Sequence, residues 1–102
     1  DPWQAAALEL VGVVGRAGEH NGRPVGVCGE TAANPLLALV LVGLGVTSLS
    51  MAPVALPAVR YALARHTLDQ CRRLAELTLA AAGPEQARQV LRAAVAPEVA
   101  AL

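Results

Sequence analysis

Two cysteines and two histidines are the side chains of this chain that could act as nucleophiles, proton carriers or soft metal ligands. Cys28 and Cys71 lie far apart in the sequence, which gives neither a disulfide framework nor the paired spacing of a zinc site. Free thiols persist in a reducing compartment, so we expect a cytoplasmic protein. We expect structural roles for Cys71, His20 and His66.

Cys28 is the thiol in the better position for chemistry. It stands near the end of a short apolar run of strand length, residues 24–29. Parallel strands present the side chains at their carboxyl ends to the catalytic face of an α/β fold. A thiol titrates near pH 8.5, so it can both donate and accept a proton with little driving force either way. The alternative interpretation is a buried and chemically inert cysteine.

Helices flank this strand in the sequence. Apolar residues recur every three or four positions over residues 3–17, which predicts a helix that Asp1 caps. A second predicted helix, residues 35–44, has Asn34 as its cap and is apolar nearly all round, so it should be buried on more than one side. The other predicted elements are a loop at 30–34, a strand at 47–51, and helices at 58–65, 67 to about 82, and 85 to about 96.

This order of elements predicts an α/β fold. Two strands joined by a helix form a βαβ unit, in which the strands are parallel. Alternate residues of a strand point to opposite faces. Each strand therefore has an apolar face, which carries Val27 or Leu49, and a face of small or weakly polar residues, which carries Cys28, Ser48 and Ser50. We expect the apolar faces to meet the helices. The small faces either line a space, such as the interior of a (βα)₈ barrel, or merely fit tight packing.

The composition excludes several classes of protein. A chain of 102 residues allows one small domain, and 55% hydrophobic residues make it too apolar to be disordered. Eight cations, all Arg, balance eight acids, which argues against nucleic-acid binding and against a polybasic membrane surface. The longest apolar run, residues 36–46, is shorter than the roughly 20 residues of a membrane span. The chain has no initial Met, so we expect a processed chain or a piece of a longer one.

Three segments carry a resemblance to a known family. They are residues 27–32 (VCGETA), 44–53 (LGVTSLSMAP) and 57–60 (PAVR). In this order and spacing they resemble the C-terminal end of the phosphoenolpyruvate-utilising enzymes, and most closely the Enzyme I branch, the phosphoenolpyruvate-protein phosphotransferases of the bacterial sugar phosphotransferase system. The resemblance covers about residues 1–82.

The resemblance implies a fold. The chain would be the last quarter of a phosphoenolpyruvate-binding (βα)₈ TIM barrel, which as a whole takes about 250 residues. The segments predicted as strands would then be barrel strands seven and eight. We treat residues 1–102 as one C-terminal fragment of that domain, made of a helix (1–22), a strand–helix–strand segment (23–52) and C-terminal helices (53–102).

The resemblance also implies one catalytic residue. In this family the cysteine of the Cys-Gly-Glu motif gives a proton to C3 of the enolpyruvate or removes one from it, and Cys28 occupies that position. Glu30 would follow at the rim, where it either orients the loop and contacts neighbouring groups or is a solvated carboxylate. Arg60, in a first helical turn, either contacts phosphate or has a structural role. Ser48 and Ser50 would shape the barrel floor.

Two departures from the family pattern stand out. Where the family commonly has Gly-Asp after the motif, this chain has Ala33 and Asn34, which removes a flexible residue and a carboxylate. The magnesium-binding carboxylates and phosphate-binding arginines of the family lie upstream of residue 1. We therefore expect no metal site and no cofactor in this chain alone, and we expect magnesium, phosphoenolpyruvate, pyruvate and a phosphocarrier protein to bind the intact parent.

The resemblance thus predicts a C-terminal fragment of an Enzyme I that moves a phosphoryl group from phosphoenolpyruvate to a protein histidine and is inactive alone. One alternative is a stand-alone, non-catalytic binding or assembly module derived from the barrel end. Another is a fragment of pyruvate phosphate dikinase or phosphoenolpyruvate synthase. Unpaired strand edges and the apolar helix 35–44 also predict a homo-oligomer.

Overall fold

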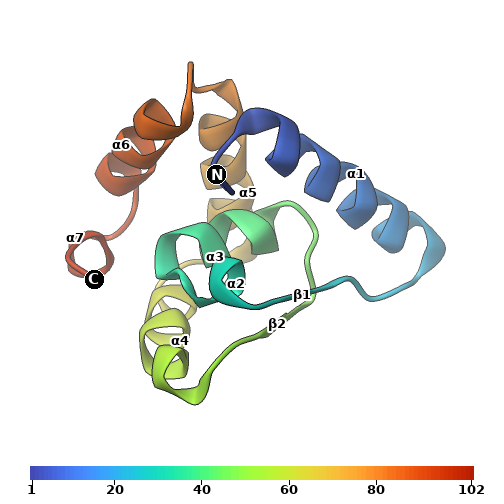
Figure 1. Cartoon of the computed structure of the whole chain (residues 1–102), viewed down its shortest axis with the longest axis horizontal. Helices are drawn as coiled ribbons and strands as arrows, with labels where there is room; N and C mark the ends of the chain where they lie inside the picture. Colours follow the sequence, from blue (N-terminus) through green and yellow to red (C-terminus); the bar gives the residue numbers. More distant parts are fainter.

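The computed structural model describes all 102 residues and shows an α/β arrangement in which two short parallel strands lie beside a group of helices (Figure 1). The predicted order of helix, strand, helix, strand and helices is confirmed. The elements are α1 (Ala5–Asn21), β1 (Gly26–Cys28), α2 (Glu30–Ala33), α3 (Pro35–Gly43), β2 (Ser48–Ser50), the 3₁₀ turn η1 (Pro53–Ala55), α4 (Leu56–Ala64), α5 (Leu68–Ala80), α6 (Pro84–Ala94) and α7 (Pro97–Ala100).

Several elements differ from the sequence-based expectation. The predicted loop at 30–34 contains the one-turn helix α2, and a further short helix, α7, follows α6. Asp1 does not cap α1. Its Oδ1 accepts a hydrogen bond from the backbone N–H of Trp3 (2.9 Å) and its carbonyl accepts one from Gln4 (3.1 Å), so the first four residues form a turn and the helix begins at Ala5.

The two strands pair in parallel, in the register Gly26↔Ser48, Val27↔Leu49 and Cys28↔Ser50. Val27 and Leu49 are half-buried and pack against the core, whereas the residues on either side of them in each strand are exposed. The apolar faces therefore meet the helices, as the alternation of apolar and small residues predicted. The opposite face of the strand pair carries small side chains and is open.

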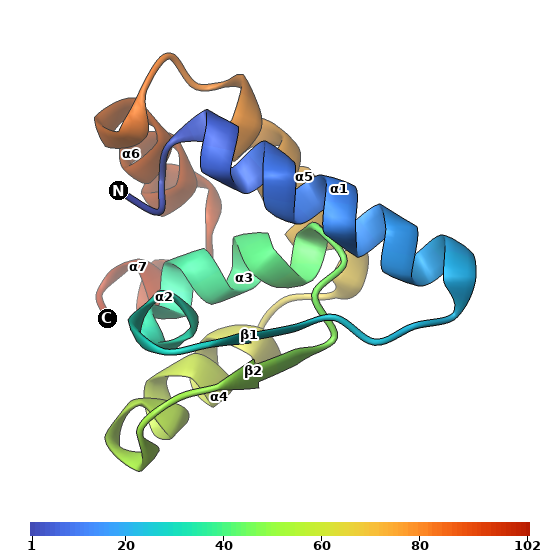
Figure 2. The same ribbon diagram turned by 45° about the vertical axis from the view of Figure 1, so that its right-hand side comes forward.

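Helix α3 lies at the centre of the molecule, between α1 and the strand pair (Figure 2). It contacts α1, α2, α4, α5 and α7. Its N-terminus follows Asn34, whose Oδ1 accepts hydrogen bonds from the N–H groups of Leu36 (3.0 Å) and Leu37 (3.1 Å), and this confirms the predicted cap. Six successive residues are buried, none more than 5% exposed: Leu36, Leu37, Ala38, Leu39, Val40 and Leu41.

Helix α1 approaches the end of α3 closely enough to exclude a side chain. The buried face of α1 carries Gly12 and Gly15, and a Cβ on Gly15 would overlap the carbonyl oxygen of Leu44. The same Cβ would lie 3.1 Å from the Cα of Gly45. The two backbones are therefore in direct contact here. A glycine within a helix costs roughly 1 kcal/mol relative to alanine, but at position 15 it permits a contact that no other residue would allow.

We predict that Gly15→Ala lowers the free energy of unfolding by about 2 kcal/mol or more, because two backbones must move apart to admit the methyl group. Gly12→Ala is the matched control on the same face. Its Cβ would meet mainly the flexible end of Arg16, at 3.3 Å, so the gain in helix propensity of about 1 kcal/mol should offset the strain. Urea unfolding followed by far-ultraviolet circular dichroism compares the two, and equal losses would contradict the close approach.

Candidate site around Cys28

Cys28 is the last residue of β1, and its side chain belongs to the open face of the strand pair. Gly29 follows with φ 92° and ψ −158°, a backbone conformation that is essentially confined to glycine. The N–H of Gly29 donates to the carbonyl oxygen of Ser50 (3.0 Å), which holds the end of β1 against β2. The Cys-Gly-Glu sequence thus ends a strand, reverses the chain direction and begins a helix within three residues.

The face around the thiol is built from small groups. Gly26, Ser48 and Ser50 share it with Cys28, and all four are exposed. The hydroxyl of Ser48 leans across to β1, since a Cβ on Gly26 would lie 2.9 Å from Ser48 Oγ. The thiol therefore stands on an open floor of small side chains with no bulky neighbour on the strands.

Glu30 is the charged residue closest to Cys28 in the chain. It is the first residue of α2, it is exposed, and none of the ion pairs of the structure includes it. A carboxylate in the first turn of a helix is favourably placed toward the backbone N–H groups. Its predicted position at the rim agrees with this placement, and its role stays a prediction.

Arg60 is not in a first helical turn, contrary to the expectation, because α4 begins at Leu56 and Arg60 is its fifth residue. The exposed arginine lines a cavity of about 270 Å³ between β2 and α4, together with Ser48 and Met51. Cys28 does not line that cavity. The structure therefore does not bring Arg60 and Cys28 into one pocket.

The residue pair Ala33 and Asn34 has a structural explanation. Asn34 caps α3 through two backbone hydrogen bonds, a task that Asp and Asn perform about equally well at a helix N-terminus. Ala33 is the last residue of α2, where alanine suits the helical backbone better than glycine does. The departure from the family pattern therefore leaves the path from Cys28 to α3 intact.

The second thiol has the opposite environment. Cys71 lies on α5, is 2% exposed and belongs to the hydrophobic core. Burial raises the pKa of the Cys71 thiol, because the charged thiolate is poorly solvated there. This placement agrees with the structural role expected for Cys71.

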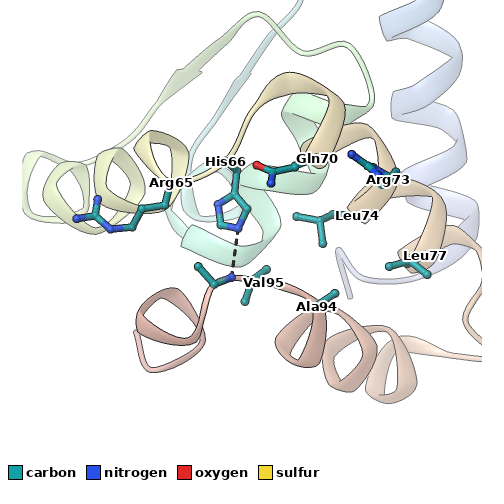
Figure 3. A pocket seen from close by; sticks show the side chains of 9 residues that line it. Arg65, His66, Gln70, Arg73, Leu74, Leu77, Ala94 and Val95 are labelled. Carbon is teal, nitrogen blue, oxygen red and sulfur yellow. Dashed lines mark hydrogen bonds between the residues drawn. The ribbon is translucent and has the colours of Figure 1, made fainter.

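His66 joins the C-terminal helices to the rest of the chain. Its Nδ1 lies 2.8 Å from the carbonyl oxygen of Ala62, and its Nε2 accepts a hydrogen bond from the N–H of Ala96 (3.4 Å), an arrangement that the tautomer with its proton on Nδ1 satisfies at both nitrogens. His66 and Gln70 line a cavity of about 450 Å³ together with Leu74 and Val95, and Figure 3 shows these side chains around it. Both ring nitrogens are occupied within the protein, which suits a structural histidine. The sequence contained no signal for this bridge.

No three His, Cys, Asp or Glu side chains gather closely enough to hold a metal ion, whereas magnesium requires several oxygen ligands in near-octahedral geometry. No helix combines the length and the apolar character that crossing a bilayer demands.

A parallel strand pair with a polar side chain at its carboxyl end, followed by a turn and a helix, is compatible with a fragment of an α/β barrel, in which active sites lie at that end of the strands. Residues 1–68 match the family described as "PEP-utilising enzyme, PEP-binding domain". The chain belongs to this family.

Characterised relatives carry names that agree with this family. The chain is 52% identical over 98 residues to the phosphoenolpyruvate-protein phosphotransferase of Streptomyces coelicolor, a match that covers 96% of this chain and 18% of the relative. A protein of the same name from Cupriavidus necator is 33% identical over 95% of this chain and 17% of its own length. The multiphosphoryl transfer protein of Xanthomonas campestris is 38% identical over 86% of this chain and 10% of its own length. The chain thus spans less than a fifth of each of these relatives.

We predict that a thiol reagent modifies Cys28 much faster than Cys71. The first thiol is exposed, whereas the second is buried and its raised pKa keeps it protonated. Iodoacetamide labelling at neutral pH, followed by peptide mass spectrometry, should show Cys28 modified first. In urea the two rates should converge. Preferential labelling of Cys71 in the folded chain would contradict the placement of both residues.

Proposed function

We propose that this chain is the C-terminal part of a phosphoenolpyruvate-protein phosphotransferase, an Enzyme I that transfers a phosphoryl group from phosphoenolpyruvate to a histidine and releases pyruvate. The observation that carries the proposal is Cys28, exposed at the carboxyl end of β1 within a Cys-Gly-Glu motif. The identity of 52% to the Streptomyces coelicolor protein of that name supports it. A phosphocarrier protein would accept the group, and the work of such a system in sugar uptake would place the enzyme in the cytoplasm.

The chemistry assigned to Cys28 is proton transfer at carbon. Loss of the phosphoryl group leaves the enolate of pyruvate, whose C3 must gain a proton. The thiol of Cys28 supplies it: a C–H bond forms at C3 while the S–H bond breaks, and its electron pair stays on sulfur as the thiolate. The reverse step takes a proton from the methyl group of pyruvate. A thiol suits both directions because it titrates near pH 8.5.

The chain alone supplies only this part of the site. Phosphoryl transfer needs cationic groups and a metal ion that stabilise the transferred charge. Arg60 lines a cavity that does not include Cys28, and the carboxylate nearest to the thiol in the sequence is that of Glu30. Magnesium and the phosphate-binding groups would belong to the rest of the parent protein. We therefore expect the isolated chain to consume no phosphoenolpyruvate in the presence of magnesium.

Two other functions remain alternatives. A stand-alone binding or assembly module would not need Cys28 at all. A fragment of pyruvate phosphate dikinase or phosphoenolpyruvate synthase would use the same thiol on the same enolate but pass the phosphoryl group to other acceptors. The names of the relatives favour the phosphotransferase.

Replacing Cys28 in the full-length protein that carries this chain tests the proposal. Cys28→Ala should slow the exchange of pyruvate methyl protons with solvent deuterium by 10²-fold or more, the usual contribution of a general acid or base. Proton nuclear magnetic resonance measures this exchange. Cys71→Ala is the control, because it removes the buried thiol and leaves the exposed one. Full exchange in Cys28→Ala, with Cys71→Ala equally active, would show that the thiol is not the proton carrier.

We also propose that the isolated chain self-associates, although one reason given for this expectation is wrong. The expectation that α3 needs cover from a second copy is wrong for its central part, because other elements of the same chain bury residues 36–41. Two other features support association: each strand has one unpaired edge, and α1 carries an exposed apolar stripe that includes Leu10 (67% exposed), Val13 (54%) and Val14 (48%). A net charge of zero does not keep copies apart.

We predict that the chain at micromolar concentration elutes as a dimer and that the double variant Leu10→Glu, Val14→Glu elutes as a monomer. Two like charges placed one helical turn apart on each copy would oppose the pairing of two stripes. Val54→Glu is the control, because Val54 is more exposed (88%) but lies on η1, away from α1. Size exclusion with light scattering distinguishes the states. A wild-type monomer of 10.4 kDa would overturn the proposal.

A further inference from the structure

Ser50 stands level with Cys28 on the neighbouring strand. The two residues are partners in the strand register, and the alternation of side chains places both on the open face, away from α3. The hydrogen bond from Gly29 N–H to the carbonyl oxygen of Ser50 (3.0 Å) fixes this end of the pair. The thiol and the hydroxyl are therefore held side by side by the backbone itself.

The preceding register pair, Gly26 and Ser48, shows that the hydroxyl of a serine on β2 can extend over its partner on β1. Ser48 Oγ lies 2.9 Å from the position that a Cβ on Gly26 would take, so its hydroxyl lies directly over its partner on β1. Paired strands lie about 4.8 Å apart. The structure contains no hydrogen bond between Ser50 and Cys28. Both side chains are exposed on the same face, so Ser50 is free to adopt the staggered rotamer that turns its hydroxyl toward β1, as that of Ser48 does at its own register pair.

The charges around the Cys28 thiol indicate what the Ser50 hydroxyl could do. The elements packed against β1 are β2 and α2. Strand β2 carries no charged residue, and the single charge on α2 is the carboxylate of Glu30. A nearby carboxylate disfavours a thiolate. Of the two serine hydroxyls that β2 carries on the face of Cys28, that of Ser50 is in register with the thiol, whereas that of Ser48 is one register pair away. A hydroxyl in this position serves both protonation states, because it accepts from a thiol and donates to a thiolate.

We propose that Ser50 is a positioning residue that orients the Cys28 thiol toward its substrate and stabilises the thiolate that remains after proton transfer. This inference rests on the proposed function of Cys28. When the S–H proton moves to C3 of the enolate, the negative charge on carbon and oxygen is replaced by a charge on sulfur. Ser50 then donates its O–H to that sulfur, and in the reverse step it returns to accepting from the thiol.

The first test measures the pH dependence of Cys28 alkylation by iodoacetamide in the chain described here. Ser50→Ala should move the midpoint of the rate profile upward by roughly one pH unit, the order expected for one lost hydrogen bond to a charged sulfur. Ser48→Ala is the matched control, because it removes a hydroxyl from the same strand and face but one register pair away. Its midpoint should equal that of the wild type. Equal midpoints in all three proteins, or equal shifts in both variants, would overturn the inference.

The second test uses the full-length protein and distinguishes the two proposals. Ser50→Ala should lower kcat for methyl proton exchange of pyruvate about tenfold, the factor equivalent to one pKa unit, and leave KM unchanged. Ser50→Thr, which keeps the hydroxyl, should restore the rate, and Ser50→Val, of similar shape without it, should not. The comparison of Thr with Val shows whether the hydroxyl itself is needed, even if the alanine variant disturbs the strand. Loss of exchange in Cys28→Ala with normal exchange in Ser50→Val would refute the role of Ser50 alone, whereas normal exchange in Cys28→Ala would refute the proposed function.

Discussion

Helix α3 has no polar side chain along its length, and the rest of the structure is arranged to keep this helix away from water. A helix that is apolar on every side must be covered on every side. Helices α1, α4, α5 and α7 and the strand pair provide that cover. Burial also removes water from the first N–H groups of the helix, which then need partners within the protein, and Asn34 satisfies two of them. The cap is therefore a condition for burying the helix.

This burial determines where chemistry can occur. Strand β1 leads into α3 through α2, and β2 leads out of it, so the two strands run parallel with one face against the helix. That face carries Val27 and Leu49, which pack against the core, and the opposite face carries small side chains. Cys28 stands at the end of this open face, and the positive φ of Gly29 turns the chain away immediately after it. The alternation of side chains along the strands therefore does two things: one face covers α3, and the other exposes the thiol.

Much of this arrangement could be predicted from the sequence, because the signals involved are local. Asn34 before Pro35 marks a helix start, the apolar run after it indicates burial, and the alternation of residues along the strands separates their two faces. The turn at Asp1 and the one-turn helix α2 were not predicted, since both are too short to show a periodic pattern in the sequence. The coverage of α3 was also misjudged. Its partners come from helices far away in the sequence, and no sequence pattern marks Gly15 as the residue that lets α1 approach so closely. Likewise the bridge from His66 to Ala96 joins residues thirty positions apart and has no sequence pattern.

The packing of α3 also explains why the chain continues beyond the segment that matches the family. That match ends at residue 68, at the start of α5, whereas the Streptomyces coelicolor relative aligns over 98 residues. Helix α5 places Leu74 and Ala75 in the core with α3, and Leu91 of α6 and Val99 of α7 complete the same cluster. Without these helices one whole side of α3 would face water, at a cost of roughly 25 cal/mol for each Å² of apolar surface. The helices after residue 68 are therefore part of the same hydrophobic core as the strand that carries the thiol. Through α3 they contribute to holding the open face in place.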